Sequence, residues 1–211
     1  MNENPQNIKS ALDDLYSIRN AIEYNTVYSS LSGLGFLLAG IITTVGYVYG
    51  FFFMNILAYF PYLILAAVIF CLSILSIFLC SFFKSREIGK KFIGTSTKKL
   101  FFNFLIPFVV GSFVILYFLG DAYFSPNAFY THKIVKLVAG FSLLVYGMSL
   151  FSARKNMHKL FGILSYSELL LGLAALVTRS FEMAWFIWAF GFGVLHIVLG
   201  IALMLKLRTK N

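Results

Sequence analysis

Two ionisable side chains stand in the middle of apolar sequence toward the C-terminus. Glu168 lies in "SELLLGLAALV" (167–177) and His196 in "AFGFGVLHIVLG" (189–200). Carboxyl and imidazole groups are the side chains that most often transfer protons in proteins. An ionisable residue inside an apolar helix is by default a functional-site hypothesis. Glu168 and His196 are therefore the first candidate residues, for a proton or ligand site.

The spacing of Glu168 and His196 predicts that they meet. If residues 165–200 form a helical hairpin whose turn is centred near Phe181 and Glu182, the two residues lie 14 positions before and 14 positions after Glu182. At a rise of about 1.5 Å per residue, equal distances from the turn mean equal depth. An isolated carboxylate at mid-membrane costs about 2.5–3.5 kcal/mol, so we expect a pair, either charged or neutral and sharing a hydrogen bond, that titrates as a unit.

Three roles for this pair remain open on the residues alone. It could be a clasp that fixes the register of the hairpin, a ligand or proton site, or part of a metal or haem site. A metal site would need further ligands, for which Asn103, Tyr146 and Tyr166 are weak candidates, and a haem would need a second axial ligand. The sequence has no metal-ligand spacing such as CxxC or HExxH, so no metal site is predicted and no cofactor is indicated.

The composition decides which elements must position these residues. A chain of 211 residues that is 60% hydrophobic and only 12% charged lies outside the range of soluble proteins. Stretches of about 20 apolar residues are needed to cross the hydrocarbon core, and they occur at 31–52, 62–83, 100–119, 134–152, 160–178 and 184–205. The predicted fold is an all-α polytopic membrane bundle of six transmembrane helices, with residues 31–211 as the transmembrane domain.

Residues 1–30 differ from the rest of the chain, because they are polar and contain no apolar span. Apolar side chains recur there at helical spacing, with Pro5 placed where a helix could begin: Ile8, Leu12, Leu15 and Ile22. This pattern predicts an N-terminal amphipathic cytoplasmic helix that packs under the bundle or pairs with a second copy, as in a homo-oligomer.

The distribution of basic residues predicts the orientation. Lys and Arg near span ends are retained on the cytoplasmic side, and 14 of the 17 fall in one set of segments, namely Lys9, Arg19, Lys84, Arg86, Lys90, Lys91, Lys98, Lys99, Arg154, Lys155, Lys159, Lys206, Arg208 and Lys210. We expect a multi-pass protein of the bacterial inner membrane with both termini cytoplasmic. The basic loops are expected to attract anionic lipid; no nucleic-acid partner is predicted.

Small and aromatic residues suggest how the last span packs. Gly193, His196 and Gly200 share one helical face, so we expect His196 to point into the protein. Trp185 and Trp188 lie near the outer end of this span, where an interfacial aromatic belt is expected.

Two stretches resemble an uncharacterised family of six-span inner-membrane proteins of Bacteroidetes-type bacteria. They are "SSLSGLGFLLAGIITTVG" (29–46) and the pair "SELLLGLAALV" and "WFIWAFGFGVLHIVLGIALMLK" (185–206). The positions that match the family pattern are Glu168, Trp188, Gly191, Gly193 and His196. The resemblance implies a stress- or envelope-linked role. "ELLLGLAAL" (168–176) is also similar to HdeD-type acid-resistance membrane proteins; neither resemblance implies a reaction.

The functional prediction follows from the lack of a soluble domain or a catalytic motif. We expect a non-enzymatic membrane protein that acts by partner or ligand binding or by self-association, with the Glu168 and His196 pair at its centre and Trp188 and Gly193 in support. The alternative is a small transporter or proton-coupled permease that uses the same pair. A membrane haem or redox protein is the third hypothesis.

Overall fold

The structure is a computed structural model that describes residues 14–16, 18, 31–53, 59–87, 89, 95–124, 128–154 and 159–208. Its helices are α2 (Gly33–Phe53), α3 (Tyr59–Glu87), α4 (Thr95–Phe124), α5 (Ala128–Ala153), α6 (Lys159–Val177), α7 (Phe181–Ala189), the π-helix η2 (Phe190–Leu195) and α8 (His196–Arg208). Within these described ranges, six helical segments are long and apolar enough to cross a membrane, with α7, η2 and α8 forming the last. The predicted all-helical, six-span bundle is confirmed.

The observed helices overlap all of the predicted spans and extend past several of them. The stretch predicted at 100–119, for example, lies inside α4, which runs from Thr95 to Phe124. A helix can continue beyond the apolar stretch because its hydrogen bonds are internal and its ends meet water at the membrane surface. The predicted amphipathic helix at 1–30 lies outside the described residues except for 14–16 and 18.

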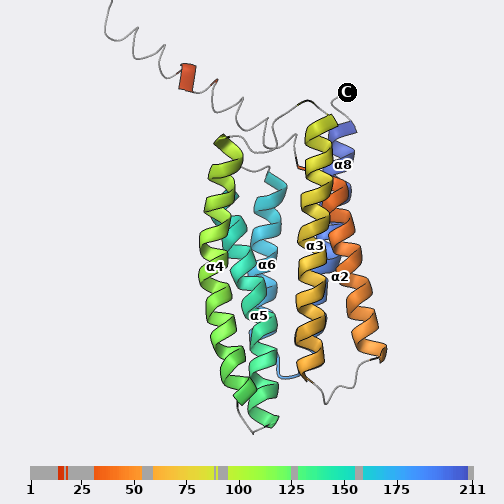
Figure 1. The fold of residues 1–211 in the computed structure, drawn as a ribbon, viewed down its shortest axis with the longest axis vertical. Helices are drawn as coiled ribbons and strands as arrows, with labels where there is room; N and C mark the ends of the chain where they lie inside the picture. The colour runs from red at the N-terminus through yellow and green to blue at the C-terminus, as the bar shows by residue number, and fades with distance from the viewer. Residues whose placement is uncertain are drawn as a thin grey trace, which may run out of the picture.

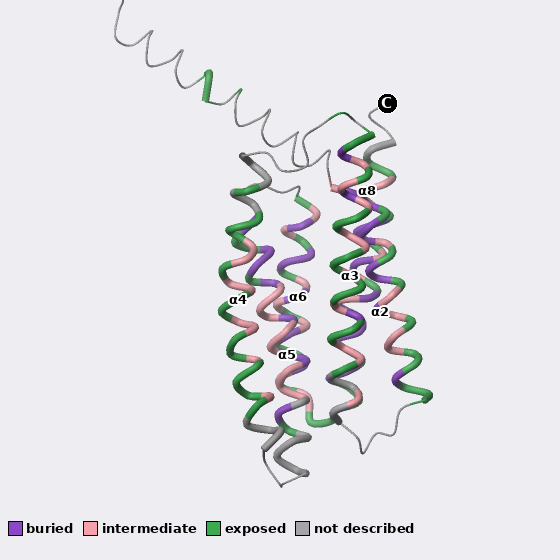
Figure 2. Tube along the Cα trace, viewed as in Figure 1, coloured by how far each residue is buried: buried purple, intermediate pink, exposed green. Residues whose placement is uncertain are grey.

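Successive spans run in opposite directions, so α2 begins at the same end of the bundle at which α8 ends (Figure 1). The described basic residues divide between the two ends. Near the end where α8 finishes are Lys84, Arg86, Lys98, Arg154, Lys159 and Lys206, whereas near the other end are Lys133, Lys136 and Arg179. The helices leave wide apolar surfaces exposed, most of all on α4 (Figure 2), as expected of helices that face lipid.

Glycines set seven residues apart bring α2 and the last span together. On α2, Gly33 faces Gly200 and Gly40 faces Gly193. A Cβ at Gly33 would lie 2.7 Å from the Gly200 carbonyl oxygen, and a Cβ at Gly40 would lie 2.6 Å from the Gly193 carbonyl oxygen. Small residues with a seven-residue spacing let two helices pack with their backbones in contact at a shallow crossing angle. The N-terminal and C-terminal spans are therefore held directly against each other.

Close packing at glycines also joins α5 to α6. Gly140 faces Gly172, and the Ser165 hydroxyl donates a hydrogen bond of 2.9 Å to the Gly147 carbonyl. These contacts hold α6 in a fixed register against α5. The position of Glu168, between Ser165 and Gly172 on α6, is set by this packing.

The turn before the last span is short. α6 ends at Val177 and α7 begins at Phe181, where the Ser180 hydroxyl accepts a hydrogen bond of 3.1 Å from the Met183 amide as an N-cap. On the other side of the turn, Lys136 donates a hydrogen bond of 2.7 Å to the Thr178 carbonyl at the end of α6. The turn therefore comprises residues 178–180 and is centred on Arg179, two to three residues before the predicted centre near Phe181 and Glu182.

The aromatic belt predicted at Trp185 and Trp188 is also wrong. Both side chains are only 7% exposed and their rings stack at 4.7 Å. The Trp188 indole N–H donates a hydrogen bond of 3.1 Å to the Ser142 hydroxyl on α5. With its polar atom satisfied inside the bundle, this indole has no need of the membrane interface.

Candidate functional site

Three ionisable side chains from three different spans meet between the two apolar clusters of the core. Glu168 on α6 is 0% exposed and His196 at the start of α8 is 3% exposed. Tyr146 on α5 places its hydroxyl 2.8 Å from His196 Nε2. One cluster surrounds Trp185 and Trp188, and the other surrounds Phe36 and Phe161.

The predicted pair of Glu168 and His196 is present. Glu168 Oε1 lies 3.8 Å from His196 Nδ1, which is ion-pair distance but too long for a hydrogen bond. Among the residues that the structure describes, neither oxygen of the Glu168 carboxyl has a hydrogen-bond partner. A fully buried carboxyl group without a hydrogen bond is unusual, because such groups are normally hydrogen-bonded.

The two residues meet although they are not equally far from the turn. Glu168 lies 11 residues before Arg179 in the turn, and Gly191, 12 residues after it, is therefore at the level of Glu168. Helical side chains lean toward the N-terminus of their own helix. The His196 ring reaches back in this way and places Nδ1 3.1 Å from the Gly191 carbonyl oxygen.

The hydrogen bonds of His196 indicate which nitrogen of the neutral ring carries the proton. Its Nδ1 lies beside a carbonyl, which can only accept, so Nδ1 carries a proton and donates it to Gly191. In the neutral ring Nε2 is then an acceptor, and the Tyr146 hydroxyl donates to it. The neutral imidazole thus satisfies both nitrogens and connects the Tyr146 hydroxyl on one side with the Glu168 carboxyl on the other.

The backbone is adapted to this arrangement in two ways. His196 follows directly on the π-helix η2, an irregularity that is frequent at functional sites. Within η2, a Cβ at Gly191 would lie 2.6 Å from Glu168 Oε2 and 2.7 Å from Leu143 Cδ2. A side chain at this position would require the ends of the Glu168 and Leu143 side chains to shift.

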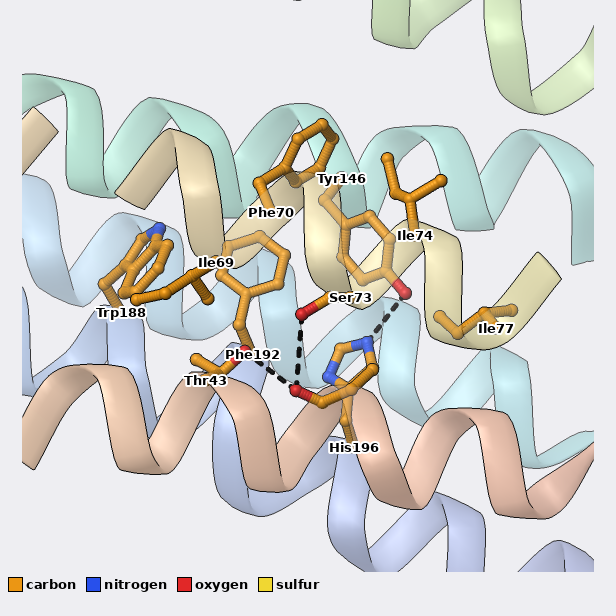
Figure 3. A pocket seen from close by; sticks show the side chains of 11 residues that line it. Thr43, Ile69, Phe70, Ser73, Ile74, Ile77, Tyr146, Trp188, Phe192 and His196 are labelled. Atoms are coloured by element: carbon orange, nitrogen blue, oxygen red, sulfur yellow. Dashed lines mark hydrogen bonds between the residues drawn. The ribbon is translucent and has the colours of Figure 1, made fainter. Parts of the chain in front are cut away.

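A cavity of about 50 Å³ lies beside His196, bounded by α2, α3, α5 and the last span. Its polar lining comes from Thr43, Ser73, Tyr146 and His196, while Trp188, Phe70 and Phe192 contribute aromatic rings. Figure 3 shows Tyr146 and His196 joined at one end of the lining, with Thr43 and Ser73 both bonded to the Ala39 carbonyl. The volume is enough for a few water molecules or one small ligand.

The other sequence-predicted residues divide into two groups. Trp188 lines the cavity, and Gly193 lies behind it at the contact with α2, where a Cβ would come 2.7 Å from Thr44 Oγ1. Asn103 and Tyr166 are not brought to the site. Asn103 is exposed on α4, and the exposed Tyr166 hydroxyl accepts a hydrogen bond of 2.7 Å from Arg154.

Sequence reasoning missed Thr43, Ser73 and Phe192. The first two are hydroxyl residues in the middle of otherwise apolar spans, a signal that could have marked them as interior positions. Phe192 gives no such signal, since it is one of 25 phenylalanines in the chain.

The site brings together one carboxyl, one imidazole and one phenol. In the described parts of the chain, no group of three or more His, Cys, Asp or Glu side chains could hold a metal ion. No protein-family model, curated protein or solved structure matches the chain.

Proposed function

We propose that this protein is a non-enzymatic membrane protein that binds a small ligand in the cavity beside His196, and that Glu168, His196 and Tyr146 link this binding to protonation. The observation that carries the proposal is the Glu168 carboxyl, which is fully buried and has no hydrogen-bond partner among the described residues. His196, whose Nδ1 lies 3.8 Å from this carboxyl group, lines the cavity.

The geometry favours this role over a structural clasp. A clasp stabilises a helical hairpin through a direct hydrogen bond between its partners, whereas Glu168 and His196 are 3.8 Å apart. The Nδ1 proton of His196 is used by the Gly191 carbonyl instead. Leaving a buried carboxyl unsatisfied is destabilising by about 1–3 kcal/mol or more, which makes sense if a bound ligand or a transferred proton compensates for it.

The polar side chains around the site come from five helices, and three of these side chains are titratable. Glu168 comes from α6, Tyr146 from α5 and His196 from α8, while α2 and α3 face the cavity with the uncharged Thr43 and Ser73. A proton that reaches the Tyr146 hydroxyl from the cavity can pass to Nε2 as the ring releases its Nδ1 proton toward Glu168. The imidazole is suited to this because both of its nitrogens exchange protons near neutral pH.

A proton-coupled permease is the second candidate, and the π-helix η2 favours it. This segment interrupts the regular hydrogen-bond ladder of the last span beside the cavity, which provides a place where the span could change shape between two states. Uptake of a ligand into vesicles on imposing a proton gradient would favour the permease. Binding without uptake would favour a ligand-binding role.

The orientation that we propose has the end with Lys84, Arg154 and Lys206 in the cytoplasm of a bacterial inner membrane. It is supported by the excess of basic residues at that end, which is retained on the cytoplasmic side. Anionic lipid is the expected partner of these side chains.

The test is a double-mutant cycle across pH. The thermal stability of detergent-purified protein would be measured from pH 4 to 9 for the native chain, Glu168→Gln, His196→Ala and the double variant. We expect the two effects to be non-additive, with a coupling that changes with pH. Ser165→Ala is the matched control, because it removes a buried hydrogen bond of α6 that cannot titrate. Additive effects that do not vary with pH would refute the proposal.

A further inference from the structure

The hydrogen atoms of the groups that line the cavity are already committed to partners within the protein. Thr43 and Ser73 both donate to the Ala39 carbonyl oxygen, at 3.0 and 3.4 Å. A hydroxyl group has one hydrogen to donate and two lone pairs that accept. While these bonds are made, each of the two side chains has lone pairs free to accept a hydrogen bond from a molecule in the cavity.

The polar groups on the opposite wall also use their hydrogens for bonds within the protein. His196 Nδ1 donates to Gly191, Tyr146 donates to His196 Nε2, and the Trp188 indole N–H donates to Ser142, at 3.1, 2.8 and 3.1 Å respectively. What these groups still present to the cavity is the lone pair of the Tyr146 oxygen and the faces of aromatic rings.

A cavity lined by lone pairs and aromatic rings favours a cation over an anion. An anion or a pure acceptor would meet no donor there, whereas a cation with N–H groups would meet oxygen lone pairs and the rings of Phe70, Tyr146 and Phe192. Aromatic faces attract cations because their π-electrons are negative, and more strongly where water is excluded. Behind His196, the buried Glu168 carboxyl supplies a counter-charge that acts through a medium of low dielectric constant.

The size of the cavity limits the cation. About 50 Å³ accommodates an occupant comparable to a few water molecules. We therefore infer that the cavity is a binding site for a small N–H cation of the ammonium or primary alkylammonium class, held by Thr43, Ser73 and Tyr146 and balanced by Glu168. This inference rests on the proposed function, since it names the ligand of the same site.

One consequence distinguishes this site from a water-filled void. Glu168 must be ionised to balance the cation, so binding competes with protonation of its carboxyl group. The apparent dissociation constant is expected to increase as the pH falls. Glu168→Gln is expected to weaken binding by about tenfold or more, the factor that corresponds to about 1.4 kcal/mol, and to remove this pH dependence.

The experiment uses the full chain in detergent and methylammonium chloride as the probe. Thermal stability would be recorded against sodium chloride at equal ionic strength, with sodium acetate as an anion of similar size and tetraethylammonium chloride as a cation too large for the cavity. We expect a saturable rise in melting temperature with methylammonium only. An equal response to acetate, or no difference between methylammonium and sodium, would overturn the inference.

A second readout does not depend on unfolding. The chain has two tryptophans, and Trp188 lines the cavity, so binding of methylammonium is expected to change the intrinsic fluorescence with the same midpoint. Thr43→Val should weaken this response. Thr44→Val is the matched control, because Thr44 makes the same type of bond, 2.9 Å to the Gly40 carbonyl, but does not line the cavity. Equal loss in both variants would argue against recognition by Thr43.

The two proposals can fail separately. A pH-dependent coupling of Glu168 and His196 together with no response to methylammonium would retain the proton-linked site and refute the cation. A specific response to methylammonium with additive, pH-independent variants would support a cation in the cavity but would refute its balance by Glu168 and the link to protonation.

Discussion

The carboxyl group of Glu168 occupies the space that a side chain at Gly191 would need, since a Cβ at Gly191 would lie 2.6 Å from Glu168 Oε2. The same contact therefore sets the level at which α6 meets the last span and the position of the buried carboxyl group. Glu168 on α6 and Gly191 in η2 lie at nearly equal distances from the turn. The contact between Glu168 and Gly191 therefore indicates how α6 is aligned along its axis with the last span.

Gly191→Ala is predicted to destabilise the protein by about 1–3 kcal/mol, as expected for overpacking in a well-packed core. Unfolding in detergent, followed by circular dichroism, would measure it. Gly162→Ala on α6 is the control, because a Cβ there meets nothing within 4 Å, and it should change stability by less than about 0.5 kcal/mol. If Gly191→Ala were as well tolerated as Gly162→Ala, the Glu168 and Leu143 side chains would be free to shift away from position 191, and the contact would not set the register of the hairpin.

Tyr146→Phe is predicted to lower stability by about 0.6–2 kcal/mol, the range for hydrogen bonds between membrane helices. The lost bond is that of the Tyr146 hydroxyl to His196 Nε2, at 2.8 Å, so the effect should disappear in a His196→Ala background. Tyr166→Phe is the matched control: it also removes a phenol hydroxyl, but one that is exposed and bonded to Arg154. A Tyr146 effect that persists without His196 would mean that packing, not the hydrogen bond, is responsible.

The six spans and the pairing of Glu168 with His196 could be predicted from the sequence, because both depend on local signals. A long apolar run must form a helix in lipid, and an isolated charge inside it needs a partner. The predicted turn lies two to three residues too late in the sequence, although Ser180 is a typical N-cap residue that could have marked the start of α7. The pairing was nevertheless right because the His196 ring reaches back to the level of Gly191.

The positions of Tyr146 and Trp188 depend on contacts between helices that are distant in the sequence, and a local sequence pattern cannot predict such contacts. Tyr146 was one of several tyrosines that could have supported the site, and only the packing of α5 distinguishes it from Tyr166. Trp188 looked like an interfacial residue because its indole needs a polar partner, and that partner, Ser142, comes from another helix. The π-helix η2 has no periodicity of its own that could have indicated it.

The packing of α2 against the last span predicts a strong effect of small substitutions. A Cβ at Gly200 would lie 2.5 Å from the Leu37 amide nitrogen, and one at Gly40 would lie 2.6 Å from the Gly193 carbonyl oxygen. Because backbone atoms cannot give way as a side chain can, Gly200→Ala and Gly40→Ala are each predicted to cost about 1–3 kcal/mol or more. Gly120→Ala, where nothing lies within 4 Å, is the control. Comparable melting temperatures for the three variants would contradict the contact between α2 and α8.

The proposed orientation can be tested with single cysteines at the two ends of the bundle. Arg179 in the turn before α7 and Lys206 near the end of α8 are both exposed, and α6, α7 and α8 place them at opposite ends (Figure 1). In a chain with Cys71→Ser and Cys80→Ser, we expect a membrane-impermeant maleimide to label Arg179→Cys in intact spheroplasts and Lys206→Cys only after the membrane is opened. This follows because the end that carries Lys84, Arg154 and Lys206 has the excess of basic residues, which are retained in the cytoplasm. Labelling of Lys206→Cys from outside, with Arg179→Cys protected, would reverse the orientation and place the basic end outside the cell.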